Sequence, residues 1–459
     1  MGCPERSGQF SLTTHEYNAF FRKQQQPLRE GIMKSIPKFI LIKQNNEAAP
    51  AVPDKAAAAR NALEALGLTE DRFSGKTVGI TGGSRGIDGI EIVLREVCSF
   101  VKEKGGTPVV FAAMGSHGGG TAEGQREVLA SLSITEETVG AEIKTCGDSK
   151  YYGETGSGYP VYGNILADTF DELVVVNRIK MHTDFEGDTE SGLLKMLAIG
   201  VGNPMGCDNV HNLALQHGYA PVLQDVGGFL LKRLNVAFGL AVTENWQHKM
   251  DSIEAIMPED VLEAEKRILA RVKAGSVKLP VKAADALIID MIGKDISGTG
   301  MDTKVVGRIR VFGQPEPEYP KIGRIAVLGL TEGSHGNAIG IGLADYTTKA
   351  VFDSIDIPAT SLNAVSSNCP EQGCLPCIVA DDYEAVRAAV GTTGLEDPTR
   401  AKAVFIQDTN HLEYIAVSEA LYEDLKENPE IEAVSDFFEL EFGEGGILKN
   451  RWSGGTLAI

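Results

Sequence analysis

The chain of 459 residues lacks the long apolar run that a membrane-spanning helix requires. A helix needs about 18 or more consecutive apolar residues to cross a bilayer, so we expect no membrane partner. The N-terminus has no apolar signal-peptide core. The seven cysteines are odd in number and scattered, which does not indicate a disulfide framework. These absences predict a cytoplasmic protein with reduced thiols.

Positive charge is also scarce. The sequence has 43 Lys and Arg against 63 Asp and Glu, which gives a formal net charge of -20. Proteins that bind nucleic acid present a basic face to the phosphates, so we expect no nucleic-acid partner. A small anionic substrate would need local cations, for which Arg85 and Lys294 are candidates.

The remaining composition is that of a globular protein, and strand and helix patterns alternate along it. The predicted strands are 37–42, 77–80, 108–113 and 172–176, with 286–290, 325–329 and 403–406 later in the chain. The predicted helices are 54–67, 87–104, 121–131 and 258–273. This alternation favours two α/β domains with mostly parallel sheets and an active site in the cleft between them. We place a disordered or loosely attached extension at 1–32 and the domains at 33–275 and 276–459.

Two of the eight histidines follow predicted strands directly. His117 lies in the glycine-rich stretch 113–120, and His182 ends the stretch 177–182. Ligands of open α/β sheets collect at the carboxyl ends of strands, and an imidazole exchanges protons near neutral pH. The pair is therefore a candidate for proton transfer, although either side chain could instead be a structural histidine of its loop.

Lys195 lies in an apolar, helix-like run, and His211 follows it. A lysine in such a run either extends its amine to solvent or holds it as a reactive group. The imidazole of His211 could bind a metal, or it could belong to a polar helix face with Asn212, Gln216 and His217.

The stretch 81–87 is similar to the cofactor loop of short-chain dehydrogenases. Asp88 stands where that loop needs glycine, and Tyr346 and Lys349 have one residue too few between them for the partner motif. An NAD(P)-dependent oxidoreductase therefore remains an alternative only. The loop could still bind phosphate through its backbone N–H groups and Arg85.

Taken in order, these motifs resemble those of the nickel-pincer lactate racemase family. The resemblance rests on Ser84-Arg85, Gly115-Ser116-His117, Lys180-Met181-His182, Gly192-Leu193-Leu194-Lys195 and His211. It covers residues 75–220 and continues more weakly to the C-terminus.

The resemblance implies an isomerase, a racemase or epimerase that inverts the α-carbon of a 2-hydroxy acid. Hydride would pass to a nickel-pincer nucleotide, a dithio derivative of nicotinic acid mononucleotide that carries nickel. Lys195 would tether this cofactor, and Gly83, Ser84 and Arg85 would help to bind it. His211 would be the nickel ligand, and His117 and His182 the acid/base pair. The implied partners are a small anionic hydroxy acid and the enzymes of cofactor biosynthesis, and a homo-oligomer is compatible with the sequence.

In the second domain, the polar loop 292–302 carries Lys294, which we prefer over Lys304 as the lysine that binds the substrate carboxylate. A tight structural turn is the alternative. The stretch 333–337, which contains His335, could line the substrate side or be a plain loop, and we favour the loop. Cys369, Cys374 and Cys377 have a spacing similar to that of plant-type iron–sulfur ligands, but no fourth cysteine follows. We interpret them as thiols.

The sequence departs from the family pattern between His182 and Lys195. This stretch is longer than usual and carries four acids, Asp184, Glu186, Asp188 and Glu190, while Met181 replaces the usual proline. These departures leave the covalent tether open and suggest a substrate other than lactate. A non-enzymatic nucleotide- or metal-binding protein is the further alternative.

Overall fold

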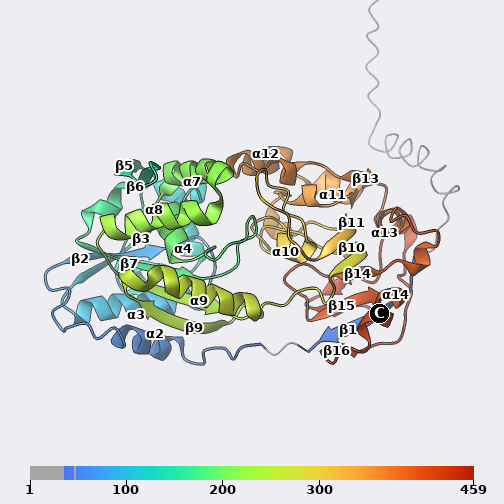
Figure 1. Ribbon diagram of the computed structural model, residues 1–459, viewed down its shortest axis with the longest axis horizontal. Coiled ribbons are helices and arrows are strands. Elements are labelled where there is room, and N and C mark those ends of the chain that lie inside the picture. The colour runs from blue at the N-terminus through green and yellow to red at the C-terminus, as the bar shows by residue number, and fades with distance from the viewer. Residues whose placement is uncertain (1–35, 46–47) are drawn as a thin grey trace, which may run out of the picture.

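The computed structural model describes residues 36–45 and 48–459, so the predicted extension at 1–32 lies outside the described residues. Two α/β units lie side by side along the long axis of the molecule (Figure 1). The predicted class, α/β with mostly parallel sheets, is confirmed. Within the described ranges, no helix is long and apolar enough to span a membrane.

The first unit contains a six-stranded sheet in the order β4-β3-β2-β7-β8-β9. Its strands are β2 (Thr77–Gly82), β3 (Thr107–Ala112), β4 (Glu142–Lys144), β7 (Glu172–Arg178), β8 (Val236–Glu244) and β9 (Met250–Ile256). All neighbours are parallel except β8 and β9. The central strands are apolar on both faces because helices cover both faces of the sheet.

Two groups of helices cover this sheet. One core contains α2 (Lys55–Glu64), α3 (Ile90–Glu103), α4 (Ala122–Ser131) and α5 (Glu136–Val139). The other contains α6 (Leu193–Lys195), α7 (Asn203–His217), α8 (Tyr219–Arg233) and α9 (Val261–Ala274). Thr121 caps the N-terminus of α4, because its hydroxyl accepts a hydrogen bond from the Gly124 N–H at 3.1 Å. A hairpin of β5 (Ser149–Glu154) and β6 (Pro160–Asn164) packs beside α7.

The second unit contains an eight-stranded sheet in the order β13-β12-β11-β10-β14-β15-β1-β16. Its strands are β1 (Phe39–Gln44), β10 (Ala283–Ile289), β11 (Lys321–Val327), β12 (Tyr346–Thr348), β13 (Cys377–Val379), β14 (Ala403–Ile406), β15 (Tyr414–Ser418) and β16 (Ile431–Ala433). The strands from β13 to β14 run parallel, and the last three pair antiparallel. The helices are α10 (Thr303–Val306), α11 (Lys349–Ser354), α12 (Ile357–Ser366), α13 (Asp382–Gly391) and α14 (Glu419–Leu425), and β17 (Trp452–Ser453) and β18 (Thr456–Leu457) form a terminal hairpin.

The first strand corrects the predicted domain division. A strand was expected at 37–42 as the start of the N-terminal domain, but β1 pairs with β15, with Phe39 opposite Ser418. A short apolar run identifies a strand without identifying its partner, so the assignment of residues 33–275 to one unit is wrong at its beginning. The chain therefore passes between the units twice, once after β1 and once after α9.

The parallel strands explain where the site forms. The carboxyl ends of β2, β3 and β7 share one edge of the first sheet, so the loops that follow them meet there. The loops after β10 and β14 meet at the corresponding edge of the second sheet. Residues from both sets of loops line one cavity, so these two edges face each other.

Candidate active site

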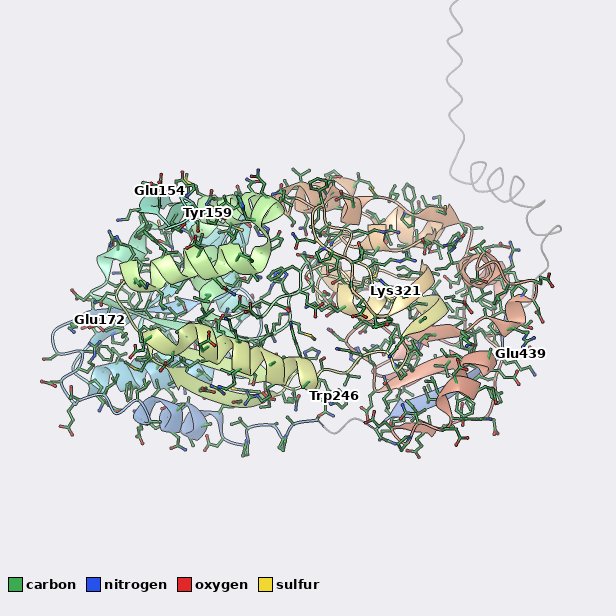
Figure 2. All side chains as sticks on the ribbon, viewed as in Figure 1. Glu154, Tyr159, Glu172, Trp246, Lys321 and Glu439 are labelled. Carbon is green, nitrogen blue, oxygen red and sulfur yellow. The ribbon has the colours of Figure 1, made fainter. Side chains whose placement is uncertain are left out.

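A cleft of about 780 Å³ lies between the two units. From the first unit it is lined by the loop at Ser84–Asp88, by the β8–β9 turn with Trp246, and by Arg178, Lys180, Met181 and Thr183. Figure 2 labels Trp246 on the side of the first unit that faces the second. The second unit contributes the loop from Lys294 to Gly298 and residues around Thr409.

Unpaired positive charge gathers in this cleft. Among the described residues no ion pair is formed by Arg85, Lys180 or Lys195, whereas neighbouring Arg178 is paired with Glu244. Desolvation and then the charge of Arg178 lower the pKa of Arg85. Like charges held together without direct ion pairs favour an anionic ligand, despite the strong negative charge of the whole chain.

The glycine-rich loop after β2 forms a narrow pocket that adjoins the cleft. Gly83, Ser84 and Arg85 line this pocket, about 140 Å³ in volume, together with His117 and Lys195. Asp88, which breaks the dehydrogenase motif, ties the loop to the β8–β9 hairpin instead: its carboxylate accepts from the Met250 N–H at 3.0 Å.

His117 presents an unprotonated nitrogen. Its Nδ1 lies 2.9 Å from the carbonyl oxygen of Met114, which can only accept, so Nδ1 carries the proton and the Nε2 lone pair is free. Desolvation and then the nearby Arg85 lower the pKa of His117 to about 4. The ring is therefore neutral at pH 7 and able to accept a proton.

His182 has the opposite tautomer. Its Nδ1 accepts a hydrogen bond from the backbone N–H of Asp184 at 3.1 Å, so the neutral ring carries its proton on Nε2. Desolvation, followed by the charge of Lys195, lowers the pKa of His182 well below its usual range. The two histidines thus offer one free base and one N–H donor.

His211, on α7, shares an aromatic cluster with His182. Phe185 stacks on the His182 ring at 4.5 Å and on Tyr219 at 4.7 Å between centroids. The Tyr219 hydroxyl lies 3.0 Å from Nδ1 of His211. This bond fixes the imidazole and directs its Nε2 away from Tyr219. Burial and then Lys195 lower the pKa of His211 to about 4.

Lys195 is the common neighbour of the three histidines, because its charge contributes to the lowered pKa of each. It ends α6, whose first N–H groups are capped by the buried carboxyl of Glu265; the Leu194 N–H donates to Oε1 at 2.9 Å. Burial and then Arg85 lower the pKa of the Lys195 ammonium to about 8. The π-helical stretch Met196–Gly200 follows, a feature frequent at functional sites.

The long acidic stretch does not separate His182 from Lys195. Lys180 and Ser191 exchange two backbone hydrogen bonds, of 3.0 and 3.1 Å, and these close residues 181–190 into a separate loop. Of the four acids in this loop, Glu190 is buried, and Glu186 and Asp188 are exposed. Burial raises the pKa of Asp184, which lies near Lys195 and Lys294.

The two lysines considered for substrate binding have different surroundings. Lys294 lines the cleft, and among the described residues its amine donates only to neutral oxygens, Gly298 O at 2.7 Å and Asn363 Oδ1 at 2.8 Å. Burial, and then Arg85, lower its pKa to about 8. Lys304 instead forms an ion pair with Glu190 at 2.7 Å, which favours Lys294 as the lysine open to a ligand.

The other singled-out side chains lie elsewhere. His335 is exposed in a turn with φ of 48°. Cys369 is buried, and Cys374 and Cys377 are exposed, all as free thiols. In the described part of the chain, no group of three or more His, Cys, Asp or Glu side chains could hold a metal ion. A metal near His211 would therefore need donors from a bound cofactor.

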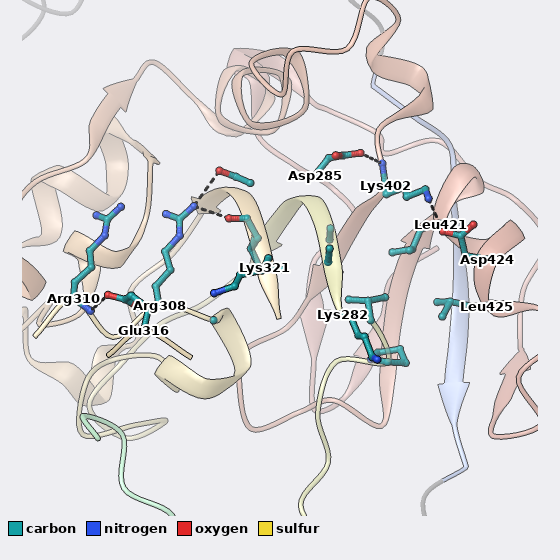
Figure 3. Close-up of a pocket in the computed structure, with 17 residues that line it drawn as sticks. Lys282, Asp285, Arg308, Arg310, Glu316, Lys321, Lys402, Leu421, Asp424 and Leu425 are labelled. Atoms are coloured by element: carbon teal, nitrogen blue, oxygen red, sulfur yellow. Dashed lines mark hydrogen bonds and ion pairs between the residues drawn. The ribbon is translucent and has the colours of Figure 1, made fainter. Parts of the chain in front are cut away.

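A second cavity, of about 1030 Å³, lies at the opposite, amino-terminal edge of the second sheet (Figure 3). Several of its charged groups already have partners: Glu316 accepts a hydrogen bond from the backbone N–H of Arg310 at 2.8 Å, and Lys402 pairs with Asp424 at 2.7 Å. Its lining contains no histidine. The cleft is therefore the better candidate for chemistry.

No known protein family matches the chain, and no curated protein is similar to it. The solved structure of the lactate racemase apoprotein from Thermoanaerobacterium thermosaccharolyticum is similar at 15% identity, covering 86% of this chain and 96% of that chain, with a TM-score of 0.48. A similarity of this size does not bear on activity, which has to be argued from the side chains.

Three contributors to the site were not identified from the sequence. Phe185 and Tyr219 form the aromatic cluster, and Glu190 anchors the loop of His182. Only the position of Phe185, next to the candidate histidine, could have indicated such a role. The partners of Tyr219 and Glu190 are distant in the sequence and required the fold.

Proposed function

We propose that the protein is a racemase or epimerase of 2-hydroxy acids that works with a nickel-pincer nucleotide. The observation that carries this proposal is the pair of neutral histidines with opposite tautomers, His117 and His182, grouped around the unpaired amine of Lys195. Inversion at one carbon requires proton transfer on two faces, and two such groups meet that requirement.

The side chains of the cleft would each have a separate task. Lys294 or Arg85 binds the substrate carboxylate, since both are cations that line the cleft. Nε2 of His117 accepts the hydroxyl proton as the carbonyl forms. His182, in its protonated imidazolium form, donates its Nε2–H when the alcohol forms again on the opposite face, and this leaves a neutral ring. The roles reverse in the other direction. His117 is neutral at pH 7 and has no proton to lose before it acts as a base, whereas His182 has to gain a proton before it acts as an acid.

None of these side chains can accept hydride, so a cofactor has to do so. The residues present fit the proposed group. Ser84 and Arg85 border a pocket suited to phosphate, and the amine of Lys195 can form a covalent bond because its pKa is lowered. His211 offers a single imidazole, which suits a metal whose other donors come from its cofactor. When bound, the cofactor supplies the hydride acceptor and the nickel.

The test is racemisation of a panel of α-deuterated 2-hydroxy acids, with chiral separation and mass detection. The protein is co-expressed with the cofactor-biosynthesis enzymes of a known nickel-pincer system. We expect inversion with deuterium retained at the α-carbon, because a hydride is transferred and returned. His117→Ala and His182→Ala should each lower kcat by about 100-fold or more. Inversion with deuterium lost to solvent would refute hydride transfer, and turnover unaffected by both substitutions would refute the histidine roles.

Nickel content and intact mass separate the parts of this proposal. Near-stoichiometric nickel with an added mass that is lost in Lys195→Ala supports a tether, and nickel without added mass supports a cofactor bound without one. If neither is found while a positive control loads under the same conditions, the cofactor proposal is wrong.

A further inference from the structure

The loop that carries His182 is anchored by one buried carboxylate, that of Glu190. Its side chain is 0% exposed. Oε2 accepts the backbone N–H of His182 at 2.6 Å, and Oε1 accepts that of Gly187 at 3.2 Å. A carboxylate that accepts hydrogen bonds from two backbone N–H groups of a short loop fixes the position of that loop more strictly than packing alone.

Two lysines neutralise this carboxylate, and they come from different units. Lys273, near the end of α9 in the first unit, lies 2.6 Å from Oε1. Lys304, on α10 in the second unit, lies 2.7 Å from Oε2, the oxygen that also holds His182. The contact on the histidine side of the carboxylate therefore depends on the second unit being in place.

Further contacts between the units end on the same loop. The Thr303 hydroxyl, next to Lys304, donates to the carbonyl oxygen of Thr183. The side-chain amide of Gln372 donates to Asp184 at 3.4 Å and to Ile309 O at 2.9 Å. The second unit thus contacts the residues on both sides of the loop, while only two chain segments connect the units.

We propose that Glu190 is a positioning residue through which Lys304 fixes His182, so that the histidine reaches its working orientation only when the second unit is docked on the first. The catalytic consequence rests on the function proposed above, whereas the mechanical coupling does not. Opening of the cleft would withdraw Lys304 and loosen the His182 N–H contact, while Lys273 keeps Glu190 neutralised within the first unit. Proton transfer would then be confined to the closed state.

The structure offers a matched pair of variants, Lys304→Met and Lys273→Met. Each removes one ammonium from the same carboxylate and keeps most of the apolar stem. Hydrogen–deuterium exchange resolved to single amides should show the His182 N–H exchanging at least about 10-fold faster in Lys304→Met. In Lys273→Met we expect the larger effect at Gly187, on the Oε1 side, with a smaller effect at His182. Thr303→Val removes only the hydrogen bond to Thr183. It should also accelerate exchange of the His182 N–H, but by a smaller factor than Lys304→Met.

The proposal would be overturned if exchange of the His182 N–H accelerated equally in both lysine variants. It would also be overturned if this exchange did not accelerate in Lys304→Met and Thr303→Val. In either case Glu190 would be an ordinary buried ion pair. Exchange is measured without substrate, so it is informative even if the protein does not act on hydroxy acids. If the parent turns over, Lys304→Met should lower kcat with little change in KM, since Lys304 is paired with Glu190 and is not among the residues that line the cleft. Lys273→Met should mainly lower stability, measured as the thermal midpoint, and affect kcat less. A change in KM alone would contradict the positioning role.

Discussion

The amine of Lys195 should be partly unprotonated at neutral pH. Burial and then Arg85 lower its pKa from 10.5 to about 8. A shift of this size increases the neutral fraction at pH 7 by about 300-fold, to roughly one molecule in ten. The neutral amine is the nucleophile, so Lys195 should react with an acylating reagent in a pH range where ordinary lysines are almost wholly charged.

Trace labelling with acetic anhydride between pH 6 and 11, followed by peptide mass spectrometry, measures this directly. The rate at Lys195 should follow a titration with its midpoint near pH 8, and exposed Lys232 on α8 corrects for reagent reactivity. Lys195→Arg confirms the labelled position. An added anion such as phosphate should raise the midpoint, since it would offset the charge of Arg85. A midpoint near 10 in the absence of anions would refute the argument that burial and crowded cations activate this lysine.

Three further outcomes follow from the geometry. Burial raises the pKa of Glu265 from 4.5 to about 7, so its stabilising contribution is complete below about pH 4.5 and is lost as the pH rises through 7. In chemical denaturation, the free energy of unfolding of Glu265→Gln should therefore equal that of the parent at pH 4.5 and exceed it by up to roughly 3 kcal/mol at pH 8. Tyr219→Phe keeps the stack on Phe185 and loses one hydrogen bond, so it should lower the free energy of unfolding by about 1 kcal/mol, and a loss as large as that of Tyr219→Ala would contradict this assignment. Gly118 and Gly119 both have a φ of 64°, but only at Gly118 would an added Cβ meet backbone, 2.4 Å from Gly124 C. Gly118→Ala should therefore lower the thermal midpoint more than Gly119→Ala.

Much of the fold could be predicted because its central strands are apolar runs flanked by glycine and polar residues. The strand predicted at 403–406 is β14 as found, and the helix predicted at 121–131 is α4 with its Thr121 cap. The partners of β1 could not be predicted, because a short apolar run identifies a strand but fits a position in either sheet. Local sequence determined the elements, and long-range pairing determined where they were placed.

The candidate site was predictable to the extent that it lies at strand ends. His117, Lys195 and Arg85 line one pocket because β2, β3 and β7 are parallel neighbours. The tautomers of the histidines depend on single backbone contacts that no spacing rule gives. From the sequence, the acidic stretch before Lys195 was interpreted as a departure from the family pattern within the site. The backbone bridge between Lys180 and Ser191 instead closes this stretch into a separate loop.

The membership of β1 in the far sheet affects how the molecule is made. In chain order, the whole first unit is inserted between β1 and the strands that β1 later joins. During synthesis, β1 leaves the ribosome before the inserted unit and stays unpaired until β15 has been made, while the inserted unit can fold on its own contacts. Deletion of β1 would therefore leave the pocket around Lys195 intact and damage a sheet on the other side of the cleft, where β15 and β16 would each lose a neighbour.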